Sequence, residues 1–268
     1  MVDRGPGQAE NGCVSDLSAG NLRTGWSYMN IRRDLLFMAA ATLVLCGLAC
    51  PIRALDLEEV LSHMNGKVES IKDLEASAKV TKYDSVFEMT SAERMKLFFQ
   101  RPYLARADTY RKEGAQEVLT TQYILGTNYI LKVWPPTRTA ERRLMDPKEI
   151  ERMAAESNDP VSLFTRKPEV IRKDFLIEAI ALPTGSPPNS FALRITPLRP
   201  DVKFEYKQVE MVIDTTTWLP RSIKAYTAGG DWSLYTFEQV KVNPGLPAST
   251  FQAPPGIDVK DVNESKGK

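Results

Sequence analysis

Few side chains in this sequence are of types that do chemistry. The one histidine, His63, stands beside Met64 in a segment of helical periodicity, and all three cysteines (Cys13, Cys46 and Cys50) precede residue 55. The sequence contains no Gly-x-Ser-x-Gly motif, no phosphate-binding loop and no metal-ligand spacing. Catalytic and metal-binding histidines need partner groups, and His63 has none in a recognisable motif. We therefore expect no enzyme, no cofactor and no metal.

The most pointed local feature is an arginine within an apolar alternation, in the run from Leu97 to Ala107. Period-two alternation places Arg101 on the same strand face as Leu97 and Phe99, just before Pro102. A charge on an apolar face is costly unless it is paired. One interpretation is that Arg101 donates hydrogen bonds to helices that cover the sheet and so acts as a latch. The other is that Pro102 ends the strand and Arg101 reaches solvent at the rim.

A helix must precede the sheet that carries this arginine. Asp56 is a suitable N-cap, and the apolar residues from Leu57 to Ile71 recur in steps of three and four. Glu58 and Glu59 in the first turn suit the positive end of the helix dipole. The pattern predicts an amphipathic helix over Asp56–Ile71.

After this helix the pattern changes to period two, with turn residues at hairpin spacing. Candidate strands cover Leu74–Thr81, Met95–Phe99, Leu104–Tyr110, Glu117–Leu125, Tyr129–Trp134, Arg138–Leu144, Phe175–Leu182, Ser190–Thr196, Tyr206–Asp214, Arg221–Thr227 and Trp232–Val240. About ten strands in succession favour one long antiparallel meander. The closing section, Val209–Val259, reads as a sheet with one apolar face and no chemical residues.

A helical insert interrupts the strands near residues 146–173. Asp146-Pro147 and Asp159-Pro160 each begin a short helical segment, and Pro168 begins a third turn. Because a long half-buried sheet must curve and cover its apolar face, the first helix and this insert are the available cover. The predicted fold class is α+β: a strongly curved antiparallel sheet, or incomplete β-barrel, covered by a helical lid.

Sheet and cover either pack into a solid core or leave an apolar cavity, and the sequence allows both. Small residues favour room inside, although they equally let a helix approach closely. The residues that we predict to line such a cavity are Leu74, Ala76, Ala78, Leu97, Phe99, Arg101, Ala105, Ala107, Met153 and Phe164.

The N-terminal part has the pattern of an export signal. Met29-Asn30-Ile31-Arg32-Arg33 is a basic start, Leu35–Ala49 is an apolar run, and Ala54 is a small residue at a cleavage position. We expect residues 29–54 to be a signal peptide cleaved near Ala54, and residues 1–28 to be a disordered or mis-assigned extension. Two alternatives are a twin-arginine signal at Arg32-Arg33 and a lipidated Cys50.

Charge excludes one class of partner. The chain has 35 Lys and Arg against 34 Asp and Glu, whereas nucleic-acid binding relies on net positive charge. We expect no nucleic acid. A cysteine-free exported domain must also fold without disulfides, and the stretch from Leu55 is long enough to form one core.

Three motifs resemble those of the periplasmic lipoprotein carrier family, LolA. They are Arg101-Pro102 followed by another strand, the Gly126 turn leading to Trp134-Pro135-Pro136, and the closing run Phe251-x-x-Pro254-x-Gly256-Ile257-x-Val259. The order of elements is also similar. The resemblance spans residues 55–261 as one lipid-binding domain and leaves 262–268 as a polar tail.

This resemblance implies a periplasmic monomer that shelters the acyl chains of a lipoprotein or other lipid during transfer between membranes. It implies an inner-membrane export complex and an outer-membrane acceptor as partners, and it places the family's latch arginine at Arg101. The alternative is an envelope sensor or adaptor domain of the same fold that binds a protein partner.

Overall fold

The computed structural model describes residues 55–156, 167–200, 202 and 204–262. The predicted extension 1–28, the signal peptide 29–54 and the tail beyond Val262 lie outside these residues, as does Phe164 of the insert. Both hydrophobic clusters of the described chain are made only of residues from Leu55 onward.

Three α-helices are described: α2 (Leu57–Ser70), α3 (Pro147–Glu156) and α5 (Pro168–Ile171). Asp56 caps α2 as predicted, because its Oδ1 accepts a 2.7 Å hydrogen bond from the N–H of Glu59. The Asp146 side chain accepts a 2.8 Å bond from the N–H of Lys148 in the first turn of α3. Among these helices none combines the length and apolarity needed to span a bilayer.

The strands form one 12-stranded sheet. They are β1 (Asp73–Asp84), β2 (Met89–Gln100), β3 (Leu104–Glu113), β4 (Gln116–Leu125), β5 (Tyr129–Trp134), β6 (Thr139–Leu144), β7 (Phe175–Ile180), β8 (Ser190–Pro197), β9 (Tyr206–Asp214), β10 (Leu219–Thr227), β11 (Trp232–Val242) and β12 (Asp258–Asp261). Two 3-10 turns, η1 (Pro135–Thr137) and η2 (Ala248–Phe251), complete the described elements.

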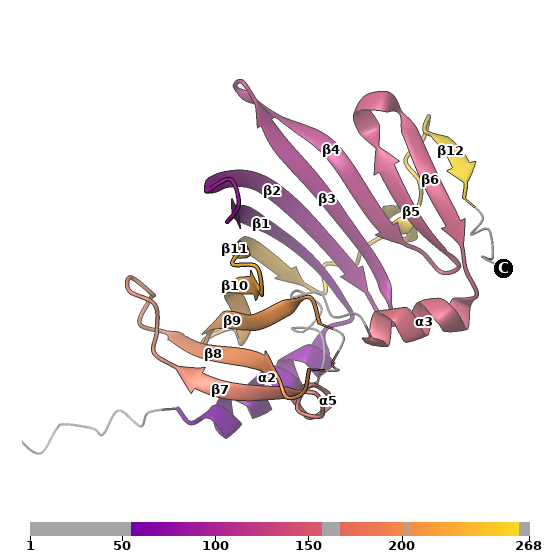
Figure 1. Ribbon diagram of the computed structural model, residues 1–268. Coiled ribbons are helices and arrows are strands. Elements are labelled where there is room, and N and C mark those ends of the chain that lie inside the picture. Colours follow the sequence, from indigo (N-terminus) through magenta and orange to yellow (C-terminus); the bar gives the residue numbers. More distant parts are fainter. Residues whose placement is uncertain (1–54, 157–166, 201, 203, 263–268) are drawn as a thin grey trace, which may run out of the picture. The chain divides into compact units, whose positions relative to one another are not determined.

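The sheet consists of two meanders side by side, in the order β12-β6-β5-β4-β3-β2-β1-β11-β10-β9-β8-β7. Strands β1–β6 form the first meander and β7–β11 the second, and antiparallel pairing of β1 with β11 joins them. The short β12 adds to β6 in parallel. The fold class predicted from the sequence is confirmed: Figure 1 shows a strongly curved, open sheet with helices along its lower side. The prediction of one continuous meander was wrong, because the consecutive strands β6 and β7 do not pair. Strand β6 lies beside β12 near one edge of the sheet, and β7 forms the other edge.

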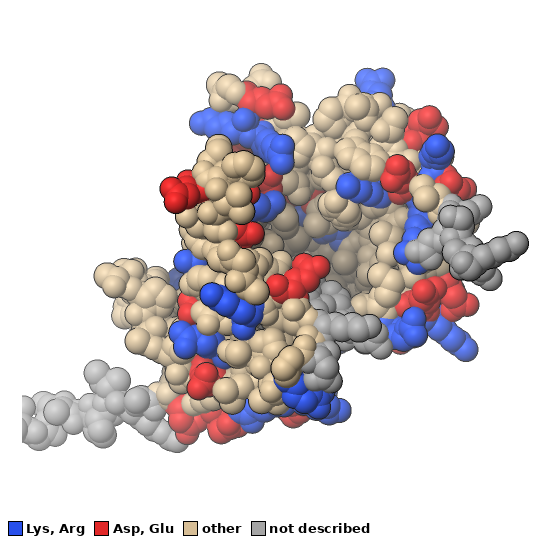
Figure 2. All heavy atoms as spheres, in the orientation of Figure 1, with Lys and Arg blue, Asp and Glu red and all other residues tan. Residues whose placement is uncertain are grey.

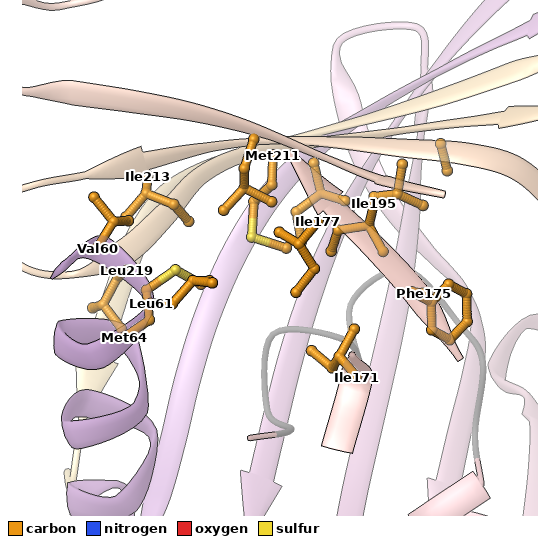
Figure 3. Packing of buried hydrophobic residues seen from close by; sticks show 14 of the residues in the cluster. Val60, Leu61, Met64, Ile171, Phe175, Ile177, Ile195, Met211, Ile213 and Leu219 are labelled. Atoms are coloured by element: carbon orange, nitrogen blue, oxygen red, sulfur yellow. The ribbon is translucent and has the colours of Figure 1, made fainter. Parts of the chain in front are cut away.

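Helix α2 packs on one face of the sheet, which we call the inner face. Figure 3 shows Val60, Leu61 and Met64 of α2 directed toward strand residues that include Met211 and Ile213. All of these side chains are at most 7% exposed. Their burial removes apolar surface from water and is the main force that holds α2 on the second meander. Helix α5 joins the same cluster through Ile171.

A second cluster lies on the opposite, outer face of the first meander. Here Ile124, Leu131 and Val133 are covered by the C-terminal segment through Phe251, and η2 lies behind β5 in Figure 1. The Tyr129 hydroxyl donates a 2.6 Å hydrogen bond to the carbonyl oxygen of Phe251 and fixes this cover. The first meander therefore buries apolar residues on both faces, whereas β9 in the closing section buries alternate residues, as the expectation of one apolar face for that section requires.

Candidate functional site

The inner face continues from the half that α2 covers into the first meander. Cross-strand partners share a face of the sheet, and the register pairs Leu97 with Ala107, Ala107 with Tyr123, and Tyr123 with Lys132. The same row includes Ala76 on β1, which belongs to the cluster under α2. One surface thus runs from the core beneath α2 across β2, β3, β4 and β5.

On β4 and β5 the inner face is more exposed than the outer face. On β4 and β5 the outer-face residues Ile124, Leu131 and Val133 are 0–1% exposed, whereas Tyr123 on the inner face is 47% exposed. The remaining inner-face residues of this half are half-buried: Leu97, Phe99, Ala105, Ala107, Leu125, Ile130 and Trp134. Figure 2 shows a hollow in front of β3 and β4 whose visible surface is mostly uncharged. We call this surface, on β2–β5, the open half of the inner face.

Lys132 on β5 places a cation in the open half. The Lys132 ammonium lies 5.4 Å from the centre of the Tyr123 ring and 4.9 Å from that of Trp134. Cation–π contact of this kind stabilises the ammonium and partly offsets the loss of its hydration. The open half is therefore an apolar surface with a positive charge held among aromatic rings.

The lower end of the inner face is closed by Arg101 and Asn243. The Arg101 side chain donates hydrogen bonds of 2.5 Å to the carbonyl oxygen of Ile71 and 2.7 Å to that of Val68. The Asn243 amide donates to the carbonyl oxygen of Ser70 at 3.0 Å and accepts from the N–H of Lys72 at 2.6 Å. The last carbonyls of a helix have no partner within it, so these two side chains hold the C-terminus of α2 on the sheet.

The two interpretations of Arg101 both describe part of what is observed. The expected hydrogen bonds to carbonyls at a helix end are present, as a latch requires. Arg101 nevertheless remains exposed as a residue, because β2 ends before it. Its charge favours the negative end of the α2 dipole while staying in contact with water.

Two ion pairs join α2 to the α5 segment. Arg172 pairs with Glu58 at the start of α2, and Lys167 lies 2.5 Å from Glu69 at its end. The hydrogen bond from Arg172 lowers the pKa of the Glu58 carboxyl, and that from Lys167 lowers the pKa of the Glu69 carboxyl. Because all four groups are solvent-exposed, these pairs are individually weak and responsive to pH and salt.

Beneath these ion pairs the apolar contact is incomplete. A narrow crevice runs between α2, α5 and strands β7–β9, lined by Met64, Val68, Pro168, Ile171 and strand residues such as Met211. Two buried residues, Pro168 and Ile171, and the surface charges attach the α5 segment. Because this buried contact is small, we expect the α5 segment to open at a lower free energy than the strands.

The structure brings together most of the residues predicted to line a cavity. Leu97, Phe99, Ala105 and Ala107 lie on the open half. Leu74, Ala76 and Ala78 share the same face of β1, but they are buried. Met153 is 39% exposed on α3, and Phe164 lies outside the described residues.

Sequence reasoning missed the part of this face on β4 and β5, including Tyr123, Ile130, Lys132 and Trp134. The period-two pattern of Tyr129–Trp134 separates two faces, but both are apolar, so it does not tell which one the chain covers. His63 is exposed, and its ring stacks on Trp218 with centroids 4.2 Å apart. In the described part of the chain no three His, Cys, Asp or Glu residues are grouped to hold a metal ion.

Comparison with known proteins finds similarity to solved structures. No protein-family model matches the sequence, and no curated protein is similar to it. Solved structures similar to this chain include a LolA superfamily protein and an outer membrane lipoprotein-sorting domain. At 10–14% identity and TM-scores below 0.5, these similarities say nothing about what this chain binds.

Three of these structures illustrate the range of identity and coverage. A putative outer membrane lipoprotein-sorting domain from Vibrio parahaemolyticus is 11% identical, with a TM-score of 0.39 over 72% of this chain and 94% of that one. A LolA superfamily protein from Nitrosomonas europaea is 10% identical, with a TM-score of 0.34 over 72% and 97%. MucB in the MucA/MucB complex of Pseudomonas aeruginosa is 14% identical, with a TM-score of 0.38 over 76% and 64%.

Proposed function

We propose that this protein is a non-enzymatic periplasmic carrier that shelters the acyl chains of a lipoprotein or another lipid on the inner face of its sheet. The observation that carries the proposal is the open half of that face. Most of its side chains are apolar and half-buried, and Tyr123 is exposed, whereas the C-terminal segment covers the outer face. Exposed apolar surface that adjoins a core is the usual mark of a binding site.

The small residues of β3 set the room available to a ligand. Ala105 and Ala107 stand between larger neighbours, with Ala107 paired to Leu97 on one side and Tyr123 on the other. Acyl chains have no directional groups, so they need only a continuous apolar trough of sufficient depth. Lys132 is placed to meet a negatively charged group at the polar end of such a ligand.

Binding on this face requires no cofactor and no covalent step. A ligand that covers the open half is protected from water on the sheet side. The basic start and apolar run before Ala54 support the proposed export to the periplasm. The inner-membrane donor and the outer-membrane acceptor are the partners that a carrier of this type requires.

The test combines mass spectrometry and competition binding. Organic extracts of the natively purified protein are expected to contain acylated lipid, and a fluorescent fatty acid is expected to bind saturably. Ala107→Phe fills the trough and should weaken binding by about tenfold, which corresponds to about 1.4 kcal/mol. The same change at exposed Ala115, in the β3–β4 turn, is the control and should have no effect.

Lipid-free extracts together with unsaturable binding would contradict the carrier function. The wild-type protein could instead capture an envelope protein. If Ala107→Phe abolished that capture, the open half would be a protein-binding surface and the sensor or adaptor alternative would hold.

A further inference from the structure

The turn between β1 and β2 carries the three most exposed large apolar side chains that the described residues contain. Val86 is 82% exposed, Phe87 72% and Met89 66%. We call Val86, Phe87 and Met89 the apolar tip. Other exposed apolar residues, such as Leu144 and Leu176, stand singly on separate strands. A cluster of large apolar side chains in water is unfavourable and marks a contact surface.

Three backbone N–H groups of this turn already have hydrogen-bond acceptors within the protein. The Asp84 carboxylate accepts hydrogen bonds from the N–H groups of Val86 at 2.9 Å and Phe87 at 3.0 Å. The Asp231 carboxylate, in the neighbouring β10–β11 turn, accepts from the N–H of Ser85 at 2.8 Å and from its hydroxyl at 2.7 Å. Paired N–H groups reduce the cost of moving a turn out of water.

Behind the apolar tip lies a row of aromatic rings. The register pairs Tyr83 with Trp232 and Trp232 with Tyr226, so three rings from β1, β11 and β10 stand at one level of the sheet. Tyr83 and Trp232 stack with centroids 5.7 Å apart. The Lys224 ammonium lies 4.4 Å from the Trp232 ring centre and 4.9 Å from that of Tyr226.

This order of side chains matches a membrane interface. Tyrosine and tryptophan prefer the headgroup level of a bilayer, where an apolar body meets a polar rim, and lysine extends its ammonium to the water there. The apolar tip lies three to six residues beyond Tyr83. The register pairs Met89 with Asp84 across the hairpin, and Val86 and Phe87 lie in the turn beyond that pair. This order suits shallow insertion into the interface, to a depth of about 5–10 Å.

We propose that the β1–β2 turn docks this protein on a lipid bilayer, with the apolar tip inserted and the row Tyr83–Trp232–Tyr226 at the headgroups. Asp84 and Glu88 of this hairpin and Asp231 of the neighbouring β10–β11 turn accompany Lys82 and Lys224. The local charge is therefore not positive, and attraction to anionic lipid does not drive docking. The proposal is independent of the carrier function, because the apolar tip and the open half of the inner face share no residue.

Vesicle binding of the segment from Leu55, which contains both hydrophobic clusters, tests this docking. We expect it to partition to phosphatidylcholine vesicles and to gain little when phosphatidylglycerol is added. The double variant Val86→Ser/Phe87→Ser should bind at least about tenfold more weakly, given the apolar area lost. Leu176→Ser, which removes a single exposed leucine, is the matched control. Circular dichroism verifies the fold of each variant.

Single cysteines locate the contact, since the sequence from Leu55 contains none. An environment-sensitive dye on Phe87→Cys should shift to the blue with vesicles, whereas the same dye on Ala115→Cys should not. Three results would each overturn the proposal: no partition to either vesicle, equal binding by the double variant, or a dye at position 87 that stays in water while the protein binds. Loss of vesicle binding with intact fatty-acid binding separates this test from that of the carrier function.

Discussion

Arg101 donates a 2.7 Å hydrogen bond to the carbonyl oxygen of Val68, so a residue just beyond β2 holds the last turn of α2. A helix end is the part of a helix that frays first, and here it lies next to the open half of the inner face. The hydrogen bonds of Arg101 therefore determine how firmly the edge of the proposed binding surface is held.

Arg101→Leu should leave the protein folded but lower its free energy of unfolding by about 1–2 kcal/mol, because hydrogen bonds from a charged group to helix carbonyls are lost. We expect faster amide exchange in the last turn of α2, intact uptake of acyl chains and disturbed release to an acceptor. Urea unfolding and a paired loading and transfer assay measure these effects. Arg101→Lys, which keeps the charge but not the forked donors, should be intermediate. Normal transfer by a stable Arg101→Leu protein would contradict the latch.

The helical cover should open before the sheet does. Of the described side chains, α3 buries Ile150 and α5 buries Pro168 and Ile171, whereas β9 and β10 contribute a continuous row of core residues that includes Met211 and Ile223. Local openings of lower free energy occur where burial is small. Hydrogen exchange is therefore expected to be faster in α3 and α5 than in β9 and β10, and lipid should change it in the helices. Equal protection in both regions, unaffected by lipid, would indicate a solid core.

Acid should release α5 from α2. The folded-state pKa values of Glu58 and Glu69 are lowered below the ordinary value of 4.5 by Arg172 and Lys167. Their contribution is complete above that ordinary value and is lost as pH falls through the lowered values. Exchange of α5 amides, corrected for intrinsic rates, should therefore rise below pH 4.5. The double variant Glu58→Gln/Glu69→Gln should show this opening already at neutral pH.

The outer-face polar cluster should be essential for stability. The Asp108 carboxylate accepts two hydrogen bonds from Arg106, at 2.8 and 2.9 Å, and one from Gln122 at 2.9 Å. Arg106 also donates to the carbonyl oxygen of Thr250 at 3.0 Å. Asp108→Ala leaves a mostly buried guanidinium and a buried amide without this partner, so we expect a loss of about 3–5 kcal/mol in urea unfolding.

The control for this cluster is Arg94→Ala, which breaks exposed ion pairs with Glu117 and Glu238. Such pairs contribute about 1 kcal/mol or less. If the Asp108 and Arg94 variants were equally stable, the buried cluster would not hold the C-terminal cover in place.

Local periodicity was sufficient to predict α2 and most strands. Asp56 and the apolar steps that follow specify the helix, and alternation with Gly, Asn and Pro breaks specifies the hairpins. The turn at Val86 was missed, because apolar residues there resemble strand rather than loop. The short polar β12 was missed because its pairing with β6 is parallel and joins distant segments.

The sequence predicted only those residues of the candidate site that stand out within a single strand. Arg101 stands out because a charge interrupts an apolar alternation. Tyr123 and Lys132 do not, because Ile124 and Leu131 beside them are equally apolar or more so, and only the docking of Phe251 decides which face is covered. That docking depends on contacts between segments far apart in the chain, which alternation does not encode.

The joining of the two meanders sets the order in which this chain can fold. Leu74 near the start of the sheet pairs with Val242 near its end, so the ladder between β1 and β11 cannot form until almost the whole sequence is available. Contacts of such long sequence separation slow folding. During synthesis, the first meander therefore presents β1 as an unpaired edge, open to other chains until the last long strand is made.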